Sequence, residues 1–415
     1  MNIMERKAEQ STRKLALEGI RVLDFTWGGA GPFATKVLAD NGAEVIKVET
    51  NTHYDFPRTM GPYAGGIKGV NRSAYFTNRN SGKRSIAINL KKKEAVAALK
   101  RLIPTVDIVA NNFRAGVLEK LGFGYQQLAA MRPDLIYVSM PLQGSAGPQA
   151  EFSGVGHTLN VLAGIFGVTG YEDGTLVGPG TNYPDHSVNP GHAMVAIMSA
   201  LIHRQRTGLG QYIEVSQLES TMNLLGPDIL AYSLTRQNPV LMGNNSAVHA
   251  PYGVFPAANG EWIAIAVESD EEWKGFCAVA SDQPWATDAG LATVAGRLAA
   301  ADRLREAVQA WTQAKDARAL MLALQGKGVP AGMVQNAKDL VEQDEQIAAR
   351  NAFVEVDHPE MGPVLYNNPP YKLSLTPPQI RSAPLIGQHN DEVFRDWAGI
   401  DAEEMERLEK LEAFV

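Results

Sequence analysis

The chain has 415 residues, of which 45% are apolar and 20% are charged. This composition excludes collagen-like, low-complexity and disordered chains, and the length predicts two or three domains of about 100–200 residues each. The net charge of −7, from 38 cationic and 45 acidic residues, argues against a nucleic-acid-binding surface. The single cysteine excludes an internal disulfide and a cysteine-rich metal site, and it predicts a cytoplasmic protein.

The apolar pattern indicates neither a signal peptide nor a membrane-spanning segment. The first fifteen residues alternate charges and lack the apolar run of a signal peptide. The longest apolar stretch, residues 193–202 (AMVAIMSALI), is too short to cross a bilayer. We therefore predict that this stretch is a buried helix, and we expect no membrane partner.

The first 215 residues alternate between predicted strands and helices. Because strands joined by helices pair in parallel, this order predicts an α/β fold built on a parallel sheet. The predicted strands are residues 20–25, 44–49, 85–89, 107–110 and 135–139, and the predicted helices are 32–40, 91–103 and 117–121.

The composition changes after Leu218. Residues 238–260 are rich in Asn, Pro, Gly and Ala, and a strand is predicted at 261–267. Residues 271–324 are predicted to be mostly helical, and short strands with proline-containing turns return at 351–378. A second, smaller region is therefore expected within the chain.

A glycine motif follows the first predicted strand. Residues 29–34 (GAGPFA) fit the GxGxxA pattern, and Glu49 lies 20 residues (49 − 29) after the first glycine, as in dinucleotide-binding folds. Two features weaken this interpretation: three extra residues precede the motif, and Pro32 removes an N–H where a phosphate would bind. A tight turn next to some other anion or acyl group is the alternative.

A cationic turn is found further along, in residues 78–85 (NRNSGKRS). Lys83 and Arg84 are adjacent cations behind a polar, glycine-containing turn, which is an arrangement that can hold a phosphate. Taken alone, however, such a pair is more typical of a solvated loop.

Asp185 follows a Gly/Pro loop and directly precedes the long apolar helix. This place predicts a capping residue, whose ionised form the helix dipole would favour. A fixed, ionised carboxylate is also what carboxylate nucleophilic catalysis needs, so both interpretations stay open. The spacings of His186, His192 and His203 differ from those of metal-binding helices, and we expect no metal site.

Two further residues are interpreted as structural. His157 lies in a glycine-containing loop, where histidine is typically a hydrogen-bonding residue. Cys277 lies among apolar and aromatic neighbours, which predicts a buried and unreactive thiol.

Taken in order, these motifs resemble the class III CoA-transferase family, which includes formyl-CoA, carnitine and benzylsuccinate CoA-transferases and the α-methylacyl-CoA racemases. The resemblance extends over nearly the whole chain. Each stretch is weak evidence alone, whereas eight in the same order are strong evidence. The matching stretches are residues 17–24 (LEGIRVLD), 30–32 (AGP), 42–49 (GAEVIKVE), 82–85 (GKRS), 112–116 (NFRAG), 206–211 (RTGLGQ), 328–332 (GVPAG) and 383–389 (APLIGQH).

The resemblance implies that Asp185 is the nucleophile, because the family's catalytic Asp precedes the helix that leads to the RTGxGQ turn. Residues 183–192 (YPDHSVNPGH) are most similar to the branch that includes succinyl-CoA:benzylsuccinate CoA-transferase. The implied reaction passes CoA from an acyl-CoA such as succinyl-CoA to an aromatic or dicarboxylic acid, through an aspartyl anhydride and an aspartyl-CoA thioester. CoA esters are then substrates, and no tightly bound cofactor is expected.

The resemblance also implies the residues that bind these substrates. Thr50, Pro141 and Gln143 depart from the residues of formyl-CoA transferases, so phosphate contacts at those places stay open. The implied CoA-binding residues are Gly29, Ala30, Asn80, Lys83, Arg84, Asn112, Phe113, Arg114 and Lys120, and the pocket for the acid is expected to include His157, Tyr183, His186 and Tyr252.

The implied fold is a large Rossmann-like α/β domain built from both chain ends, with a smaller α+β domain inserted between them. The expected parts are residues 1–224 of the large domain, 225–330 of the small domain, and 331–415, which link back to the large domain. Members of the family form interlocked dimers. We therefore expect a homodimer, or a heteromer with a homologous subunit.

Three other functions stay open. A racemase would use His157 and Asp185 to move an α-proton, with Glu268 nearby. The glycine motif leaves an NAD-dependent oxidoreductase as an alternative. A non-catalytic partner subunit would need only the fold, although the presence of Asp185 argues against it.

Overall fold

The computed structural model describes residues 14–414 of the chain. They form two compact units. Unit 1 comprises the residues up to 165, 179–237 and those from 348 onward, and unit 2 comprises 166–178 and 238–347. Unit 1 is therefore assembled from both ends of the chain. The domain boundaries expected at residues 224 and 330 stay predictions.

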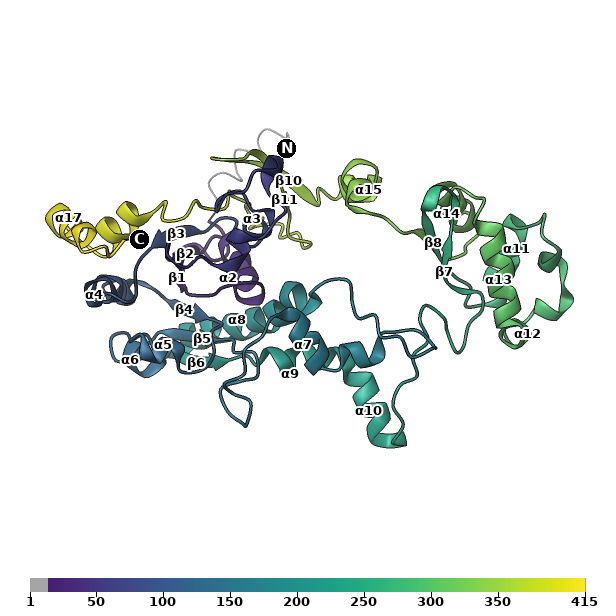
Figure 1. Ribbon diagram of the computed structural model, residues 1–415, viewed down its shortest axis with the longest axis horizontal. Helices are drawn as coiled ribbons and strands as arrows, with labels where there is room; N and C mark the ends of the chain where they lie inside the picture. The colour runs from purple at the N-terminus through teal and green to yellow at the C-terminus, as the bar shows by residue number, and fades with distance from the viewer. Residues whose placement is uncertain (1–13, 415) are drawn as a thin grey trace. The chain divides into compact units, whose positions relative to one another are not determined.

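Unit 1 is built on a six-stranded sheet with the order β3-β2-β1-β4-β5-β6 (Figure 1). All neighbouring strands in this sheet are parallel, which confirms the predicted α/β class. A separate antiparallel pair, β10 and β11, also belongs to this unit. The strands are β1 (Arg21–Asp24), β2 (Glu44–Glu49), β3 (Arg84–Ala87), β4 (Ile108–Asn111), β5 (Ile136–Ser139), β6 (Gln211–Glu214), β10 (Phe353–His358) and β11 (Gly362–Asn367).

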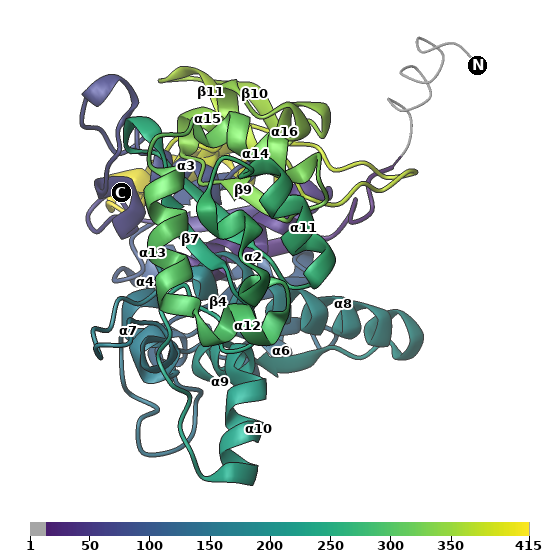
Figure 2. The same cartoon turned by 90° about the vertical axis from the view of Figure 1, so that its right-hand side faces the viewer.

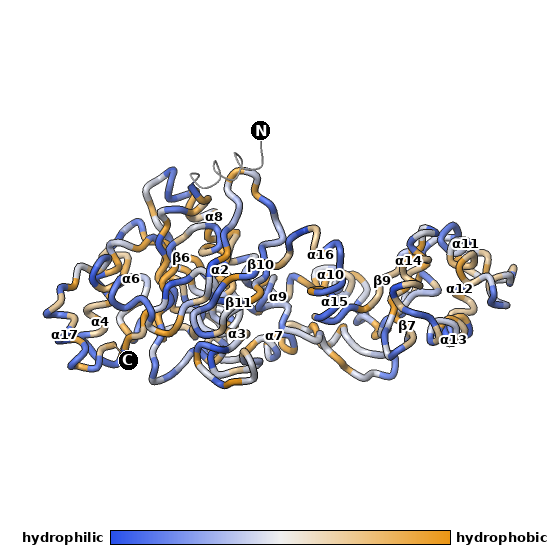
Figure 3. Tube along the Cα trace, turned by 90° about the horizontal axis from the view of Figure 1, so that it is seen from above, coloured by the Kyte–Doolittle hydropathy of each residue, from blue (hydrophilic) through white to orange (hydrophobic). Residues whose placement is uncertain are grey.

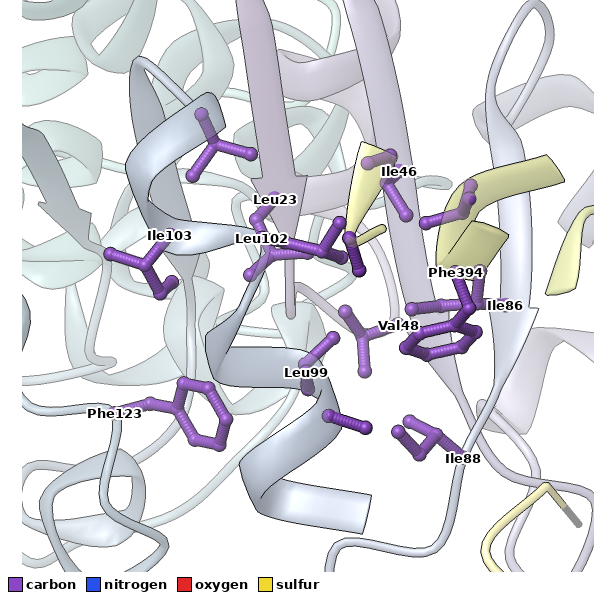
Figure 4. Close-up of a cluster of buried hydrophobic side chains, with 14 of the residues drawn as sticks. Leu23, Ile46, Val48, Ile86, Ile88, Leu99, Leu102, Ile103, Phe123 and Phe394 are labelled. Atoms are coloured by element: carbon purple, nitrogen blue, oxygen red, sulfur yellow. The ribbon is translucent and has the colours of Figure 1, made fainter. Parts of the chain in front are cut away.

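The large sheet has an apolar core on each face, because successive side chains of a strand point to opposite sides. On one face, Leu23 and Ile46 pack with Leu99 and with Phe394 from the C-terminal part of the chain (Figure 4). The other face is covered by α2 and α8. The helices of unit 1 include α2 (Ala30–Asp40), α3 (Ala74–Arg79), α4 (Lys93–Lys100), α5 (Val117–Lys120), α6 (Tyr125–Ala129), α7 (Gly156–Leu162), α8 (Asn189–Thr207), α9 (Gln217–Met222), α10 (Gly226–Thr235) and α17 (Ala402–Lys410).

The long helix α8 (Figure 2) is buried on one side only, so the prediction of a buried helix is only half right. Ala193 and Ile197 are buried against the sheet, whereas Val195 is 69% exposed and Ile202 is 46% exposed. A helix that packs on a sheet turns only one side toward the core, so these apolar residues lie outside it. Within the described residues, no helix is long and apolar enough to cross a membrane.

Unit 2 combines an antiparallel three-stranded sheet, in the order β7-β8-β9, with a layer of helices. Its core is a cluster of aromatic rings from Trp273, Phe276, Trp285 and Trp311. Apolar positions recur along its helices (Figure 3). The elements are β7 (Tyr252–Pro256), β8 (Trp262–Ala266), β9 (Ala331–Met333), α11 (Asp270–Val279), α12 (Val294–Ala299), α13 (Ala301–Thr312), α14 (Ala317–Gln325) and α15 (Ala337–Glu342), and α16 (Glu345–Ala349) spans the boundary with unit 1.

Candidate active site

The sheet order of unit 1 reverses between β1 and β4, since β2 and β3 lie on one side of β1 and β4 to β6 lie on the other. In open parallel sheets, such a reversal leaves a crevice at the carboxyl ends of the two strands. A pocket of about 230 Å³ lies there, lined by residues 27–30 after β1, residues 112–114 after β4, and Asp185. It is smaller than the clefts of roughly 300–1,000 Å³ that enclose a whole ligand, so it fits the reacting end of a long substrate.

Two glycines enclose the Asp185 carboxylate. A Cβ atom at Gly29 would lie 2.6 Å from Asp185 Oδ2, and one at Gly156 would also lie 2.6 Å from that oxygen. Gly28 has a φ of +78°, and a Cβ atom there would lie 2.8 Å from the ring of Phe56. Only glycine allows these approaches, so the two loops hold the carboxylate between their backbones.

The turn after β1 is anchored by two side chains. Asn112 accepts a hydrogen bond from the Trp27 N–H (2.8 Å) and donates one to the Trp27 carbonyl (2.7 Å). The Gly28 N–H donates to Asp55 Oδ1 (2.9 Å). Helix α2 begins at Ala30, and the glycine before it offers no capping side chain. The first N–H groups of α2 therefore lie at the pocket without a side-chain cap.

Asp185 lies in η5 (Pro184–Val188), a π-helical segment that leads directly into α8. Its side chain makes no capping hydrogen bond, so the prediction of a helix cap is wrong. The reason is local, because η5 places Asp185 inside the helical run, where the Asp185 N–H donates to the Asn182 carbonyl (3.0 Å). Single π turns are frequent at functional sites.

Asp185 is 8% exposed, and its carboxylate forms no ion pair or side-chain hydrogen bond with any other residue that the structure describes. Burial raises the pKa of Asp185 to about 6, and attraction to Arg79 and His157 opposes only part of this rise. Asp185 therefore ionises at a higher pH than an ordinary aspartate, although it is still largely ionised at pH 7. Burial outweighs the favourable charges.

The buried Arg79 pairs with the half-buried His186, the residue that follows Asp185. Arg79 Nη2 lies 2.6 Å from His186 Nε2, and the guanidinium lies over the Tyr75 ring, 3.6 Å from its centroid. Burial and the nearby Arg79 charge lower the pKa of His186 to about 4. The imidazole is therefore neutral near pH 7 and accepts a hydrogen bond from Arg79.

A buried ion-pair network lies under the same end of the sheet. Its six side chains have no exposed surface, and each carboxylate has its own cation. The pairs are Asp24 with Lys83 (2.9 Å), Asp55 with Lys47 (2.9 Å) and Glu49 with Arg58 (2.7 Å).

Lys83 is part of this network and does not line the pocket. Its ammonium group is within 2.9 Å of oxygens from Asp24, Pro32, Thr35 and Asn80. This surrounding leaves Lys83 no exposed surface with which to contact a phosphate, contrary to expectation. The amide of Asn80 is fully buried and bonds Lys83 through its oxygen, so it too lies away from the pocket.

Glu49 also belongs to the network, which contradicts the dinucleotide interpretation. Both of its oxygens accept from Arg58 at 2.7 Å, and one also accepts from Ser85. Because Glu49 is buried and fully bonded, it has no free oxygen for a ribose hydroxyl.

The other expected CoA contacts separate into two groups. Gly29, Ala30, Asn112, Phe113 and Arg114 line the pocket with Asp185. Arg84 and Lys120 do not. Arg84 lines a different hollow and pairs with Glu392 (2.7 Å) and Glu44 (3.6 Å), and Lys120 is exposed at the end of α5.

The four residues expected in the pocket for the acid lie in different parts of the structure. His157 follows Gly156 and is exposed, and Tyr183 is exposed two residues before Asp185. His186 is turned toward Arg79, as described above. Tyr252 belongs to unit 2, where it lies in β7. Sequence reasoning did not identify several residues of the site. Trp27, Phe56, Leu142 and Gln217 carry no distinctive signal, whereas Gly156 lies next to His157 and Arg79 lies in the cationic turn of residues 78–85.

Comparison with known proteins gives a consistent result. The model of CoA-transferase family III matches residues 17–390. The chain is 33% identical to the succinyl-CoA–D-citramalate CoA-transferase of Chloroflexus aurantiacus, over 95% of this chain and 96% of that protein. It is 32% identical to the succinate–glutarate CoA-transferase of Agrobacterium fabrum, over 95% and 98%. It is 35% identical to the succinyl-CoA:mesaconate CoA-transferase of Haloarcula marismortui, over 93% and 97%.

Solved structures show the same likeness. The crystal structure of a CAIB/BAIF family protein from Brucella suis matches with a TM-score of 0.85 and 29% sequence identity. The match covers 93% of this chain and all of that one. Similarity to the benzylsuccinate branch stays a prediction. The chain belongs to CoA-transferase family III, whose members use CoA thioesters as substrates.

Proposed function

We propose that Asp185 is the nucleophile in a transfer of CoA from succinyl-CoA to a dicarboxylic acid. The observation that carries this proposal is a buried carboxylate, open to a pocket and held between Gly29 and Gly156 without an ion-pair partner. A structural carboxylate this deeply buried normally has a cation or several donors. The relatives named above carry dicarboxylic acids in their names, which supports the substrate class.

The first half of the proposed reaction transfers CoA from the donor to Asp185. A carboxylate oxygen attacks the thioester carbonyl carbon, the C–S bond breaks, and CoA leaves as a thiolate. The thiolate then attacks the aspartyl carbonyl of the mixed anhydride, and the donor acid leaves as its carboxylate. The product of this half is an aspartyl-CoA thioester.

The second half repeats these steps with the acceptor. The acceptor carboxylate attacks the aspartyl thioester, and CoA thiolate is released again. The thiolate then attacks the acceptor carbonyl of the second anhydride. The bond to Asp185 breaks, and its carboxylate is regenerated. No net proton or electron is transferred, so the reaction needs no redox group.

The N-terminus of α2 fits the role of an oxyanion site in this reaction. Its first N–H groups have no side-chain cap, and Ala30 lines the pocket beside Asp185. The partial positive charge of a helix N-terminus stabilises a developing oxyanion. We assign Arg114, which is exposed at the pocket, to the CoA phosphates, and Asn112 and Phe113 to the pantetheine chain.

The acceptor is proposed to be a dicarboxylic acid with an apolar or aromatic substituent, of which benzylsuccinate is one. Four aromatic rings, from Trp27, Phe56, Phe113 and Phe152, line the pocket. These rings favour an apolar group next to the reacting carboxylate.

We also propose that the chain works as a homodimer or with a homologous subunit. Helix α10 has no buried residue, although it carries Ile229, Leu230 and Leu234, and the outer side of α8 is also apolar. Apolar faces of this kind mark protein contacts. Light scattering on the purified chain tests this proposal. A dimer supports the homodimer, and a monomer at micromolar concentration contradicts the homodimer.

Covalent trapping tests the role of Asp185. The chain is incubated with succinyl-CoA, and hydroxylamine or borohydride is then added. Peptide mass spectrometry is expected to find the modification on Asp185. The Asp185→Ala variant should lose both the adduct and CoA transfer, yet still bind CoA. A panel of dicarboxylic acids with and without an aromatic ring identifies the acceptor.

A racemase remains the second candidate, because the charge of His157 acts on Asp185. Exchange of the α-proton of a branched acyl-CoA, with no adduct on Asp185, would favour this alternative and contradict the transferase mechanism.

A further inference from the structure

We propose that Arg79 is a positioning residue for CoA transfer, one that fixes the turn carrying Asp185 and places a positive charge near the nucleophilic carboxylate. This inference rests on the proposed role of Asp185. It concerns the last residue of α3, which lies more than a hundred positions before Asp185 in the chain (185 − 79 = 106).

The guanidinium of Arg79 is held in one place by three contacts. Nη1 donates to the Tyr75 carbonyl (3.1 Å), and Nη2 bonds His186 Nε2 (2.6 Å). The flat group also stacks over the Tyr75 ring. Arg79 is only 2% exposed, so this arrangement costs desolvation of a full positive charge.

Arg79 differs from the other fully buried cations that the structure describes. Lys47, Arg58, Lys83 and Arg297 each form an ion pair with a carboxylate. Arg79 forms none with any described residue, and its Nε has no hydrogen-bond partner. An unpaired buried cation is destabilising, which calls for another reason for its place in the fold.

The nearby unpaired carboxylate supplies that reason. The charges of Arg79 and Asp185 attract each other, and Asp55 also acts on Arg79. The bond to His186 extends this link through the chain, because His186 is the next residue after Asp185. The His186 ring also packs near Phe33 of α2 (6.1 Å between centroids). One side of the turn is thus fixed by Arg79.

Other titratable groups on the elements around η5 are occupied or exposed. Lys36 of α2 pairs with Asp40, and His192 of α8 bonds the Val188 carbonyl. His157 of α7 and Glu219 of α9 are exposed to solvent, and water screens their charges. Two charges act on the Asp185 carboxyl, and of these Arg79 is buried whereas His157 is exposed.

The pH profile of kcat/KM separates this role from a purely structural one. The wild-type acid limb is expected near pH 6, where Asp185 ionises. Arg79→Gln removes the charge, so its acid limb should move to higher pH by about one unit, which is a loss of roughly fivefold at pH 6 and roughly tenfold below pH 5. Arg79→Lys keeps the charge and should restore the limb to within half a unit, even where kcat falls.

Two further variants keep the test decisive. His186→Gln leaves the Arg79 charge in place, so it should lower kcat without moving the acid limb. This variant tests the inference even when Arg79→Gln does not fold. Arg303→Gln, an exposed arginine of unit 2, should match wild type. Coincident acid limbs in wild type and Arg79→Gln, or a limb shifted equally by His186→Gln, would overturn the inference. An Asp185→Ala chain that still transfers CoA would instead overturn the proposed function.

Discussion

Two sets of buried charges lie at the same end of the sheet of unit 1, and they are arranged in opposite ways. In the buried ion-pair network, burial raises the pKa of Asp24 and Glu49, but their paired cations reverse the effect and hold both pKa values below the usual range. At Asp185, burial is not matched by a pair, and the pKa rises to about 6. The same sheet end thus holds carboxylates that are fully compensated and one that is not.

The difference shows how a fold can combine rigidity with reactivity. A carboxylate bonded on every side stabilises structure but has no lone pair free for attack. A carboxylate without partners is costly, and it is tolerated where it has a chemical task. The network also supports the site directly, because Asp55 bonds the Gly28 N–H as well as pairing with Lys47.

The largest loss of stability is expected when the buried ion-pair network is broken. Lys83→Met leaves Asp24 buried without its cation, which should lower the free energy of unfolding by about 3–5 kcal/mol. Urea denaturation measures this change, and the exposed Lys91→Met is the matched control, expected within about 0.5 kcal/mol of wild type. A stable Lys83→Met chain that has lost CoA binding would show that Lys83 contacts the ligand after all.

Removing the charge of Asp185, which has no ion-pair partner, should instead raise the free energy of unfolding. Because the folded-state pKa of Asp185 is raised to about 6, the native state holds this proton more tightly, and stability falls as pH rises from the ordinary aspartate pKa to that value. The raised pKa corresponds to a destabilisation of roughly 3 kcal/mol once the group is ionised. Asp185→Asn should therefore be more stable than wild type at pH 8, and the gap should narrow toward pH 4 in thermal unfolding. A variant less stable than wild type at pH 8 would mean that Asp185 is a compensated group.

Asp185 depends on the glycine at position 29 for its place in the pocket. A Cβ atom at Gly29 must displace the carboxylate, and Gly29→Ala should lower kcat/KM by about a hundredfold, since small misplacements of a reacting group are that costly. Gly180→Ala is the control, because no atom lies within 4 Å of its Cβ position. Equal activities of the two variants would contradict the enclosure.

The smallest effect is expected in unit 2. Burial raises the pKa of Cys277 to about 11, so its thiol is protonated at neutral pH. Cys277→Ala should leave the transfer rate unchanged within about twofold and cost about 1 kcal/mol of stability. An alkylating reagent that stops transfer in wild type, and not in Cys277→Ala, would contradict this prediction.

Five of the six strands in the large sheet were predictable, because short β-branched runs between helices have few other structures open to them, whereas β6 was missed. The residues after β1 and β4 were also identified, because a glycine turn and an Asn-Phe pair are local signals. The pKa of Asp185 was not predictable, since it depends on Gly156, Arg79 and the loss of water around them. The burial of Lys83 was not predictable for a similar reason, because two of its acceptors, Asp24 and Pro32, lie more than fifty residues before it in the sequence.

The discontinuity of unit 1 has a consequence for synthesis on the ribosome. One of its two sheet cores contains Leu23 and Ile46 together with Phe394, Met405 and Leu408, from opposite ends of the chain. Part of the apolar face of the first strands therefore stays open to water until the C-terminal residues have emerged. Unit 2 lies wholly between these segments and can complete its own core earlier. The part of the protein made first is thus the part finished last, and this interval is when a nascent chain most needs protection from aggregation.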